Sequence, residues 1–449
     1  MAEMDEWHIP EDLLVRFLRT EVSRAEGRAV VRHLVSGCPQ CTELSHRVTT
    51  ALGLWQQGKT AWEHAYEEVF QRAFAFATEE EQRIALEKLR GWGQWAMLEP
   101  LNPQVRFAVV EADPNYHSFG LYDRLLEASR LYMRREPAEA VDIVRLALFV
   151  AERLDPKRHG NERVADLRAS AWAELGNMKR LASDFEGARR AFNEAWRILE
   201  EEGTNDPLEQ AHITSLEASY IDELGDFETA ETTLVDALHL YQQIGDIHLQ
   251  GRTLLKMGDF IGKIHPERGI AHIRKALPLI ETAREPRLEL CAQHDLAWFL
   301  NDAGQPEEAL AVLEKARPLY KAFPDSYTQF RLHWLEGKIA HNLGAFEDAE
   351  STFQQLWEEF RARDLNHEIV LISIDLAETL VKKGEAQRAA ELVAQCYPIL
   401  KGWGLHRYAL AAWMFFERAL GEAQAGSHIF RRIREYYHRH WVRPATFEM

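Results

Sequence analysis

The chain has 449 residues, of which 46% are hydrophobic and 28% charged, a composition typical of a folded, water-soluble protein. Its formal net charge of -18 repels a phosphate backbone, so we expect no general binding of nucleic acid. No apolar run approaches the roughly 20 residues of a membrane-spanning helix. The acidic opening residues also lack the features of an export signal, so a cytoplasmic protein without membrane association is expected.

The first candidate site lies near the N-terminus, where two cysteines stand close together. Cys38 and Cys41 are separated by two residues, and this spacing lets both thiolates bind one metal ion through a tight turn. His33 lies about one helical turn before this pair, and His8 precedes an amphipathic helix expected over about Glu11 to Thr20. Such nitrogen and sulfur ligands favour zinc, and four protein ligands leave no position for a reactive water, so a structural ion is expected.

Two alternatives remain open for this segment. His46, five residues beyond Cys41, is an alternative fourth ligand in place of His8. The run from Gly37 to Pro39 is alternatively a simple loop between helices, with the histidines on the surface.

Residues 7 to 48 resemble the zinc-binding helical domain of anti-sigma factors, which carries an upstream His or Cys, then His-Leu, then a Cys pair. Four residues separate His33 from Cys38, one more than in most of that family. The resemblance implies a domain over residues 1–48, a sigma factor as partner, and a zinc ion held by His8, His33, Cys38 and Cys41. It also implies that loss of one cysteine to a disulfide releases the metal.

Residues 49–119 are expected to be helical without repeating and to form a linker or N-terminal cap. The run Gly53–Thr60 matches the phosphate-binding loop pattern, and Ile369–Asp375 resembles the apolar strand ending in aspartate that usually accompanies it. No apolar strand precedes the loop, however, and the second run fits a helix of the repeats, so a nucleotide hydrolase is a distant alternative. Because no other catalytic motif is present, we expect a protein that is not an enzyme.

The strongest signal is a period of about 40 residues. Small residues that begin a second helix recur at intervals of 42, 39, 40, 40 and 40, at Ala188, Ala230, Gly269, Ala309, Ala349 and Ala389. Five of these positions follow a similar turn sequence, and glycine marks the break in four of them, at Gly225, Gly304, Gly344 and Gly384. Apolar residues recur at spacings of three and four on both sides of each turn, which predicts helical hairpins that must stack to bury their faces.

One segment resembles a tetratricopeptide repeat, because its Trp, Leu-Gly, Ala, Phe and Ala stand at that family's spacing, at Trp172, Leu175, Gly176, Ala188, Phe192 and Ala195. The period is longer than the usual one, as in the longer variants of bacterial regulators and peptide sensors that the chain resembles. The resemblance implies an all-α fold, an α-solenoid over residues 120–404 with capping helices over 405–449. The basic residues of this cap, Arg431, Arg432, Arg434, Arg439 and Arg443, are interpreted as the solvated side of a final helix.

The first helix of each hairpin is expected to line a groove for an extended peptide or a partner helix. Projecting the repeats along the chain gives the lining residues Asn177, Arg180, His212, Asp222, His294, Trp298, Asn301, Arg331, Trp334, Lys338 and Asn342. The last four of these combine an aromatic residue with cations and suit a carboxylate or an acidic peptide. Alternatively, these polar side chains only solvate the inner face.

The sequence therefore predicts a non-enzymatic scaffold or regulator that binds a protein or peptide partner. In one version its N-terminal zinc segment acts as an anti-sigma factor domain in transcriptional regulation. In the other, the chain is an assembly adaptor or a peptide-sensing receptor without a transcriptional role.

Overall fold

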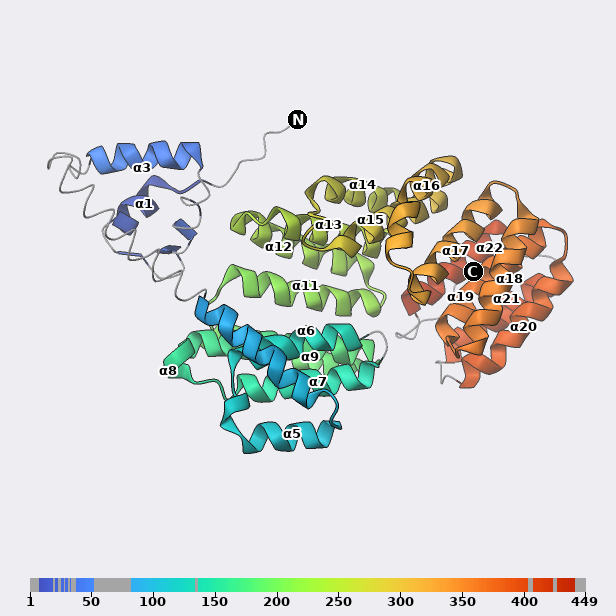
Figure 1. Ribbon diagram of the computed structural model, residues 1–449. Coiled ribbons are helices and arrows are strands. Elements are labelled where there is room, and N and C mark those ends of the chain that lie inside the picture. The colour runs from blue at the N-terminus through green and yellow to red at the C-terminus, as the bar shows by residue number, and fades with distance from the viewer. Residues whose placement is uncertain are drawn as a thin grey trace. The chain divides into compact units, whose positions relative to one another are not determined.

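The computed structural model describes residues 8–18, 21–22, 26–27, 29–30, 33, 38–51, 82–133, 136–402, 407–422 and 426–440 (Figure 1). In these residues the regular structure is helical and includes no strand, so the expected all-α solenoid of tetratricopeptide-like hairpins is confirmed. The chain divides into two compact units, Met1–Glu217 and Ala218–Met449, and each contains hydrophobic cores of its own. None of the helices in the described residues is long and apolar enough to cross a membrane.

The first unit begins with a small pair of helices and continues into helical hairpins. Its helices are α1 (Glu11–Leu18), α3 (Pro39–Ala51), a helix over 82–98, α5 (Pro103–Ala112), α6 (Phe119–Tyr132), α7 (Pro137–Ala151), α8 (Pro156–His159), α9 (Asn161–Leu181) and α10 (Phe185–Glu202). The boundary between the units falls within α11 (Pro207–Glu223). A short 3-10 turn, η1 (Pro114–Tyr116), follows α5, and Asp113 caps it by accepting from the N–H of Asn115.

The second unit consists of hairpins that pair each helix with its neighbour along the chain. Its helices are α12 (Phe227–Ile244), α13 (Ile247–Gly262), α14 (Pro266–Ala276), η2 (Leu277–Leu279), α15 (Pro286–Asp302), α16 (Pro306–Ala322), α17 (Ser326–Asn342), α18 (Phe346–Ala362), α19 (Asn366–Lys382), α20 (Ala386–Gly402), α21 (Arg407–Gly421) and α22 (Ser427–His440). The run Ile369–Asp375 lies inside α19, so it is helical as expected from the repeats and not a strand.

The turns of the hairpins follow local rules that the sequence carries. At the four expected glycines φ lies between 77° and 83°, a left-handed conformation that residues with a Cβ atom rarely adopt. Ser183 stands at the fifth turn and adopts the same conformation, with φ of 61°. The side chain of Asp184 then accepts a hydrogen bond from the N–H of Gly187 at 2.9 Å and caps α10. The hairpin boundaries are therefore set within a few residues of each turn.

The small residues of the period lie where two helices approach closely. Each of the six is the fourth residue of its helix and is buried. A Cβ atom on Gly269 would lie 2.7 Å from the Cα of Gly262 on the preceding helix, which is closer than Cβ atoms approach. The hairpin of α13 and α14 thus keeps the close helix contact of the others by using glycine on both sides.

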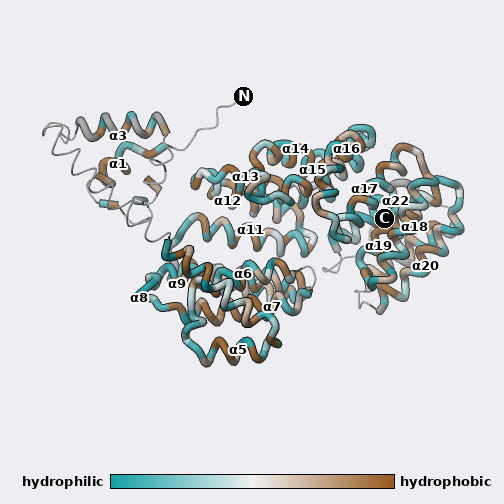
Figure 2. Tube along the Cα trace, viewed as in Figure 1, coloured by the Kyte–Doolittle hydropathy of each residue, from teal (hydrophilic) through white to brown (hydrophobic). Residues whose placement is uncertain are grey.

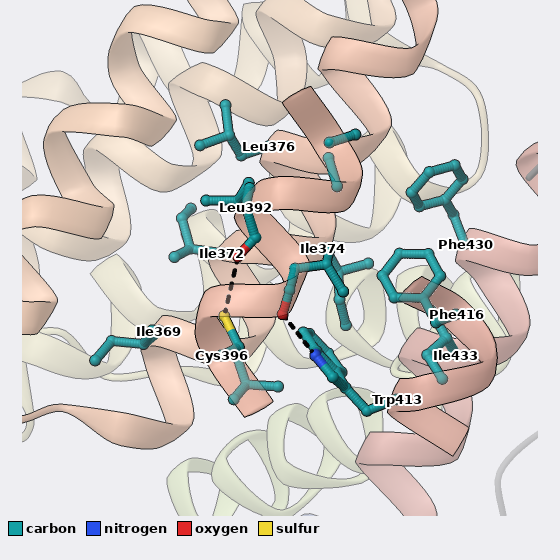
Figure 3. Packing of buried hydrophobic residues seen from close by; sticks show 14 of the residues in the cluster. Ile369, Ile372, Ile374, Leu376, Leu392, Cys396, Trp413, Phe416, Phe430 and Ile433 are labelled. Carbon is teal, nitrogen blue, oxygen red and sulfur yellow. Dashed lines mark hydrogen bonds between the residues drawn. The ribbon is translucent and has the colours of Figure 1, made fainter. Parts of the chain in front are cut away.

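Hydrophobic side chains fill the space between successive hairpins. Hydrophobic and hydrophilic segments alternate along each helix in Figure 2, as amphipathic helices require. In the C-terminal part, the ring of Phe416 on α21 contacts both Trp413 of the same helix and Phe430 of α22, and all three side chains are fully buried (Figure 3). The indole N–H of Trp413 donates to the carbonyl of Val393 at 2.8 Å, so this large side chain is buried without leaving its donor unpaired.

The final helix α22, red in Figure 1, differs from the solvated helix expected from its basic sequence. Tyr436 and Tyr437 are buried, and the guanidinium of Arg434 lies 2.7 Å from Asp375 and 3.0 Å from Glu378, both on α19. That interpretation is therefore wrong for these residues, because α22 packs onto its neighbours with its apolar side and pairs Arg434 with the buried carboxylate of Asp375.

Arg439 at the end of α22 also has partners within the second unit. Its Nη2 atom lies 2.9 Å from Oε1 of Glu228, and its guanidinium lies 5.5 Å from the ring centroid of Phe227. Both partners belong to α12, the first complete helix of this unit. The C-terminal cap therefore contacts the beginning of the second unit as well as its end.

Candidate functional site

The four residues predicted as metal ligands come together in the first unit. The ligand atoms of His8, His33, Cys38 and Cys41 all lie within 4.8 Å of one another. Nδ1 of His8 is 3.4 Å from Sγ of Cys38 and 3.6 Å from Sγ of Cys41. The extra residue between His33 and Cys38 therefore does not keep His33 away from the other three.

Packing of α1 against α3 positions this cluster (Figure 1). Cys41 is buried among apolar residues that include Leu14 of α1 and Val48 of α3. The backbone N–H of Ile9 donates to Sγ of Cys41 at 3.3 Å, an interaction that also suits a thiolate. Burial raises the pKa of the Cys41 thiol, so this site favours a thiolate only when a positive charge is close to it.

The two distances from His8 suit ligands that share one tetrahedral metal ion. Zinc bonds of about 2.1 Å to nitrogen and about 2.3 Å to sulfur place neighbouring ligand atoms roughly 3.6 Å apart, close to the two His8 distances. Two imidazoles and two thiols are also a donor set that zinc prefers. The side chain of His46, the alternative ligand, and the phosphate-loop match Gly53–Thr60 lie outside the described residues.

The residues predicted to line a groove divide between the two units. Asn177, Arg180 and His212 lie in the first unit, and the other eight lie in the second. Oδ1 of Asn177 accepts from Arg180 at 3.0 Å, one turn later on α9. The single groove proposed from the sequence stays a prediction.

A buried carboxylate that the sequence did not single out joins the first helices of the first unit. Glu174 of α9 accepts from Nε of Arg130 of α6 at 3.2 Å and lies 3.4 Å from Nε2 of His212 of α11. Burial raises the pKa of this carboxyl, but the hydrogen bonds and charges of His212 and Arg130 outweigh burial and lower it to about 2. His212 is therefore a structural neighbour of Glu174 in addition to being a candidate binding residue.

In the second unit, cations on the first helices are paired with carboxylates one hairpin earlier. The three pairs are Lys263 with Asp222 at 2.9 Å, Arg331 with Asp295 at 2.6 Å, and Lys338 with Asp302 at 2.8 Å. Burial raises the pKa of the Asp222 and Asp295 carboxyls above their usual value. An acidic ligand would therefore have to replace a carboxylate of the chain itself at Arg331 or Lys338.

Aromatic residues lie between these pairs. The ring of Trp298 on α15 makes an edge contact with Trp334 on α17, with centroids 5.9 Å apart, and Nζ of Lys338 is 4.3 Å from the Trp298 centroid. Both tryptophans are only partly buried. The indole N–H of Trp334 donates to Asp375 of α19 at 2.7 Å. We call the side of α13, α15, α17 and α19 that carries these residues and the three ion pairs the first-helix face.

Three further predicted residues belong to this face. Nδ1 of His294 lies 2.6 Å from the hydroxyl of Tyr320, and burial lowers the pKa of His294 well below its ordinary value, so its imidazole is neutral. The side-chain N–H of Asn342 donates to the backbone carbonyl of Asn301 at 3.1 Å. Each of these contacts fixes a polar side chain of one helix against its neighbour.

The sequence analysis missed the carboxylates that hold this face together, namely Asp295, Asp302 and Asp375, and it also missed Glu174 in the first unit. The sequence did contain a signal for these ion pairs, namely the number of residues between the two partners of each pair. Asp295 and Arg331, like Asp302 and Lys338, are 36 residues apart, and Asp222 and Lys263 are 41 apart, each close to one repeat. Opposite charges separated by one period on first helices would have indicated these pairs.

These features define the chain as a helical-repeat protein built from tetratricopeptide-like hairpins, with a His–Cys cluster at its N-terminal end. Comparison with protein-family models and with curated proteins finds no match. Among solved structures, the chain is similar to aspartyl phosphate phosphatase F from Bacillus subtilis, at 13% identity over 87% of this chain and 93% of that one, with a TM-score of 0.50. It is also similar to a Rap protein complexed with Competence and Sporulation Factor, at 15% identity over 69% of this chain and 84% of that one, with a TM-score of 0.54. At such identities the likeness shows the fold.

Proposed function

We propose that the chain is a non-enzymatic scaffold or regulator that binds a protein or peptide on the first-helix face. The observation that carries this proposal is the pair of partly exposed tryptophans, Trp298 and Trp334, on neighbouring first helices. Aromatic side chains supply much of the binding energy of protein interfaces because they bury a large area at little entropic cost. The Rap protein in the comparison, which has this type of fold, carries a bound factor, and this supports the same use here.

The proposal is tested with the full chain and a displayed library of random peptides. Peptides selected on the natural chain are synthesised, and their dissociation constants are measured by calorimetry against Trp298→Ala and against Met414→Ala. Met414 is an exposed apolar residue of α21 and serves as the matched control for loss of a large side chain. We expect at least a tenfold loss for Trp298→Ala, because one lost aromatic anchor costs about 1.4 kcal/mol or more, and none for Met414→Ala. Failure to select any peptide, or equal binding by both variants, would contradict the proposal.

For the N-terminal segment we propose a structural zinc ion held by His8, His33, Cys38 and Cys41. The convergence of two imidazoles and two thiols at ligand distances supports it. Metal analysis of the purified chain is expected to give about one zinc per chain, a content lost in Cys38→Ser and retained in Cys291→Ser. A chain that purifies without zinc under reducing, metal-replete conditions would refute this proposal.

We also propose that this segment, residues 1–48, acts like an anti-sigma factor domain in a cytoplasmic regulator, followed by a cap over 49–119, repeats over 120–404 and capping helices over 405–449. The support is the resemblance of the His and Cys spacing together with the fit of the cluster to zinc. Co-expression of the full chain with sigma factors is the test, and retention of one of them that depends on Cys38 is the expected result. Retention of other proteins on the first-helix face alone would favour the adaptor or peptide-sensing receptor.

A further inference from the structure

The last helix, α22, differs in its packing from the second helices of the hairpins before it. In the hairpins from α15 to α20, each second helix packs between its own first helix and the first helix of the next hairpin. As the second helix of the last hairpin, α22 packs against its own first helix, α21, and also against α19, the first helix of the preceding hairpin (Figure 1). It thus turns back toward the first-helix face, to which α19 belongs.

The middle of α22 is joined to this face through the carboxylate of Asp375. Oδ1 of Asp375 accepts from Arg434 at 2.7 Å, and Oδ2 accepts from the indole N–H of Trp334 at 2.7 Å. Arg434 also lies 3.0 Å from Glu378. Burial raises the pKa of the Asp375 carboxyl, but the charges of Arg434 and Lys338 lower it below its ordinary value. Thus α22 supplies a cation to a carboxylate that also fixes one of the two tryptophans assigned to partner binding.

The C-terminal end of α22 contacts the turn between α11 and α12. Nη2 of Arg439 lies 2.9 Å from Oε1 of Glu228, and a Cβ atom on Gly225 would clash with the carbonyl oxygen of Arg439. Between these contacts and α19 lies His438, whose pKa is lowered to about 3 by burial and then by the charge of Lys263, at the end of α13. The helix therefore connects the last first helix of the face to the beginning of α12.

The charges on this surface indicate what kind of helix it accepts. Asp375, Glu378 and Glu228 each have an arginine of α22 as ion-pair partner. The cations of the first helices, in contrast, are paired with carboxylates of those helices, as Arg331 is with Asp295. Without α22, three carboxylates would lose their ion-pair partner on a surface that also carries two tryptophans. Such an acidic and aromatic surface is complementary to a helix that carries arginines.

We propose that α22 is a built-in ligand of the first-helix face, and that the partner is a basic amphipathic helix that binds by displacing it. The inference rests on the proposed function and adds the class of the partner and the regulation of the face. In α22 itself, Phe430 and Tyr437 lie against α21 while the arginines meet carboxylates. The apparent affinity for a partner is reduced by the fraction of molecules in which α22 is docked.

The first test uses the peptides selected from the displayed library on the natural chain, and it measures their binding to Arg434→Gln and to Arg431→Gln. Arg431 is an exposed arginine of the same helix, so the control changes the net charge equally. We expect the peptides to be rich in Arg and Lys and to bind Arg434→Gln about tenfold more tightly than the other two chains, because a weaker internal ligand competes less. Peptides without an excess of basic residues, or equal binding to all three chains, would overturn the proposal.

A second variant keeps this test decisive if Arg434→Gln folds poorly. Arg439→Gln breaks the ion pair with Glu228, whose side chain is 49% exposed, and so leaves no buried carboxylate without its cation. We expect the same peptides to bind this variant several-fold more tightly than the natural chain. Unchanged or weaker binding to Arg439→Gln would count against displacement of α22.

The last experiment follows α22 directly, by hydrogen exchange of the full chain with and without a saturating selected peptide. Exchange over residues 427–440 is expected to become faster with the peptide, while exchange over α15 and α17 becomes slower. If the peptide binds and residues 427–440 exchange as before, displacement of α22 is refuted while the binding of a partner stands. If no peptide is selected on the natural chain or on Arg434→Gln, partner binding itself is refuted, and the role of α22 with it.

Discussion

Replacing Glu174 by glutamine is expected to destabilise the first unit and to change the pH dependence of its stability. The carboxylate accepts from Arg130 of α6 and lies 3.4 Å from Nε2 of His212 of α11, so it joins three first helices. Its side chain is only 2% exposed, and solvent therefore screens these interactions little. Glutamine keeps the size of the side chain but loses the negative charge.

The magnitude follows from the pKa of the carboxyl, which is about 2 in the folded protein. An unfolded chain titrates its glutamates near 4.3, so the folded state binds this proton less tightly than the unfolded state does. The stabilisation is then fully present above about pH 5 and is lost as the pH falls through 4 toward about 2. A difference of roughly two pKa units corresponds to about 3 kcal/mol of unfolding free energy.

Urea unfolding of the full chain, followed by far-ultraviolet circular dichroism, measures this effect at about pH 7 and about pH 3. We expect Glu174→Gln to lose about 3 kcal/mol at the higher pH and much less at the lower one. Glu162→Gln, at an exposed carboxylate on the same helix, changes the net charge equally and is expected to stay within about 0.5 kcal/mol of the natural chain. Unchanged stability of Glu174→Gln near neutral pH, or a loss independent of pH, would refute the charged interaction.

Three further changes are expected to give measurable effects. Gly337→Ala would place a Cβ atom 2.5 Å from Cε1 of the buried Phe353 ring, and it is expected to cost about 1–3 kcal/mol in urea unfolding. Trp334→Phe removes the N–H that donates to Asp375 at 2.7 Å, and it is expected to cost about 1–2 kcal/mol in the same assay. Removal of metal by a chelator, or Cys38→Ser without one, is expected to speed hydrogen exchange over residues 8–48, because the proposed zinc ion would join the segments at the starts of α1 and α3.

The first and the last of these expectations each have a control that separates the expected effect from a general one. A Cβ atom on Gly93 meets nothing within 4 Å in the helix over 82–98, so Gly93→Ala is expected to leave stability unchanged or to raise it slightly. Equal losses for Gly93→Ala and Gly337→Ala would show that packing against Phe353 is not the cause. Hydrogen exchange of α19 should be unaffected by the chelator, and a change there would contradict a local role for the metal.

Much of the fold was predictable because its signals are local. The turn at Gly304 and the small residue at Ala309 are five residues apart, and each acts through the backbone conformation or helix contact at its own position. The same holds for Cys38 and Cys41, whose spacing within one turn predicts that both could bind the same metal ion. These features need no knowledge of what lies far along the chain.

Prediction from charge and hydropathy along the sequence failed where the environment of a residue depends on another hairpin. The basic sequence of α22 is typical of a solvated helix. In the structure, however, Arg434 donates a hydrogen bond to Asp375, 59 residues earlier in the chain, and the tyrosines near it on α22 are buried. Similarly, the sequence analysis treated Arg331 as a cation available to a ligand, but in the structure it forms an ion pair with Asp295. Charge and hydropathy along one helix do not report these partners, because they lie on other helices.

By itself, the sequence determined the period, the hairpins, the turns and the residue types that could bind a metal or line a face. Only the tertiary structure decided which polar groups are paired, since hydrogen bonds between hairpins depend on how far one helix is rotated and shifted against the next. Asn301 shows this most clearly, because Asp222 and His341, which also stand three residues before the glycine of their turns, have side-chain partners and it has none. The partners of Asp222 and His341 lie on the following hairpin, so no local pattern in the chain reveals them.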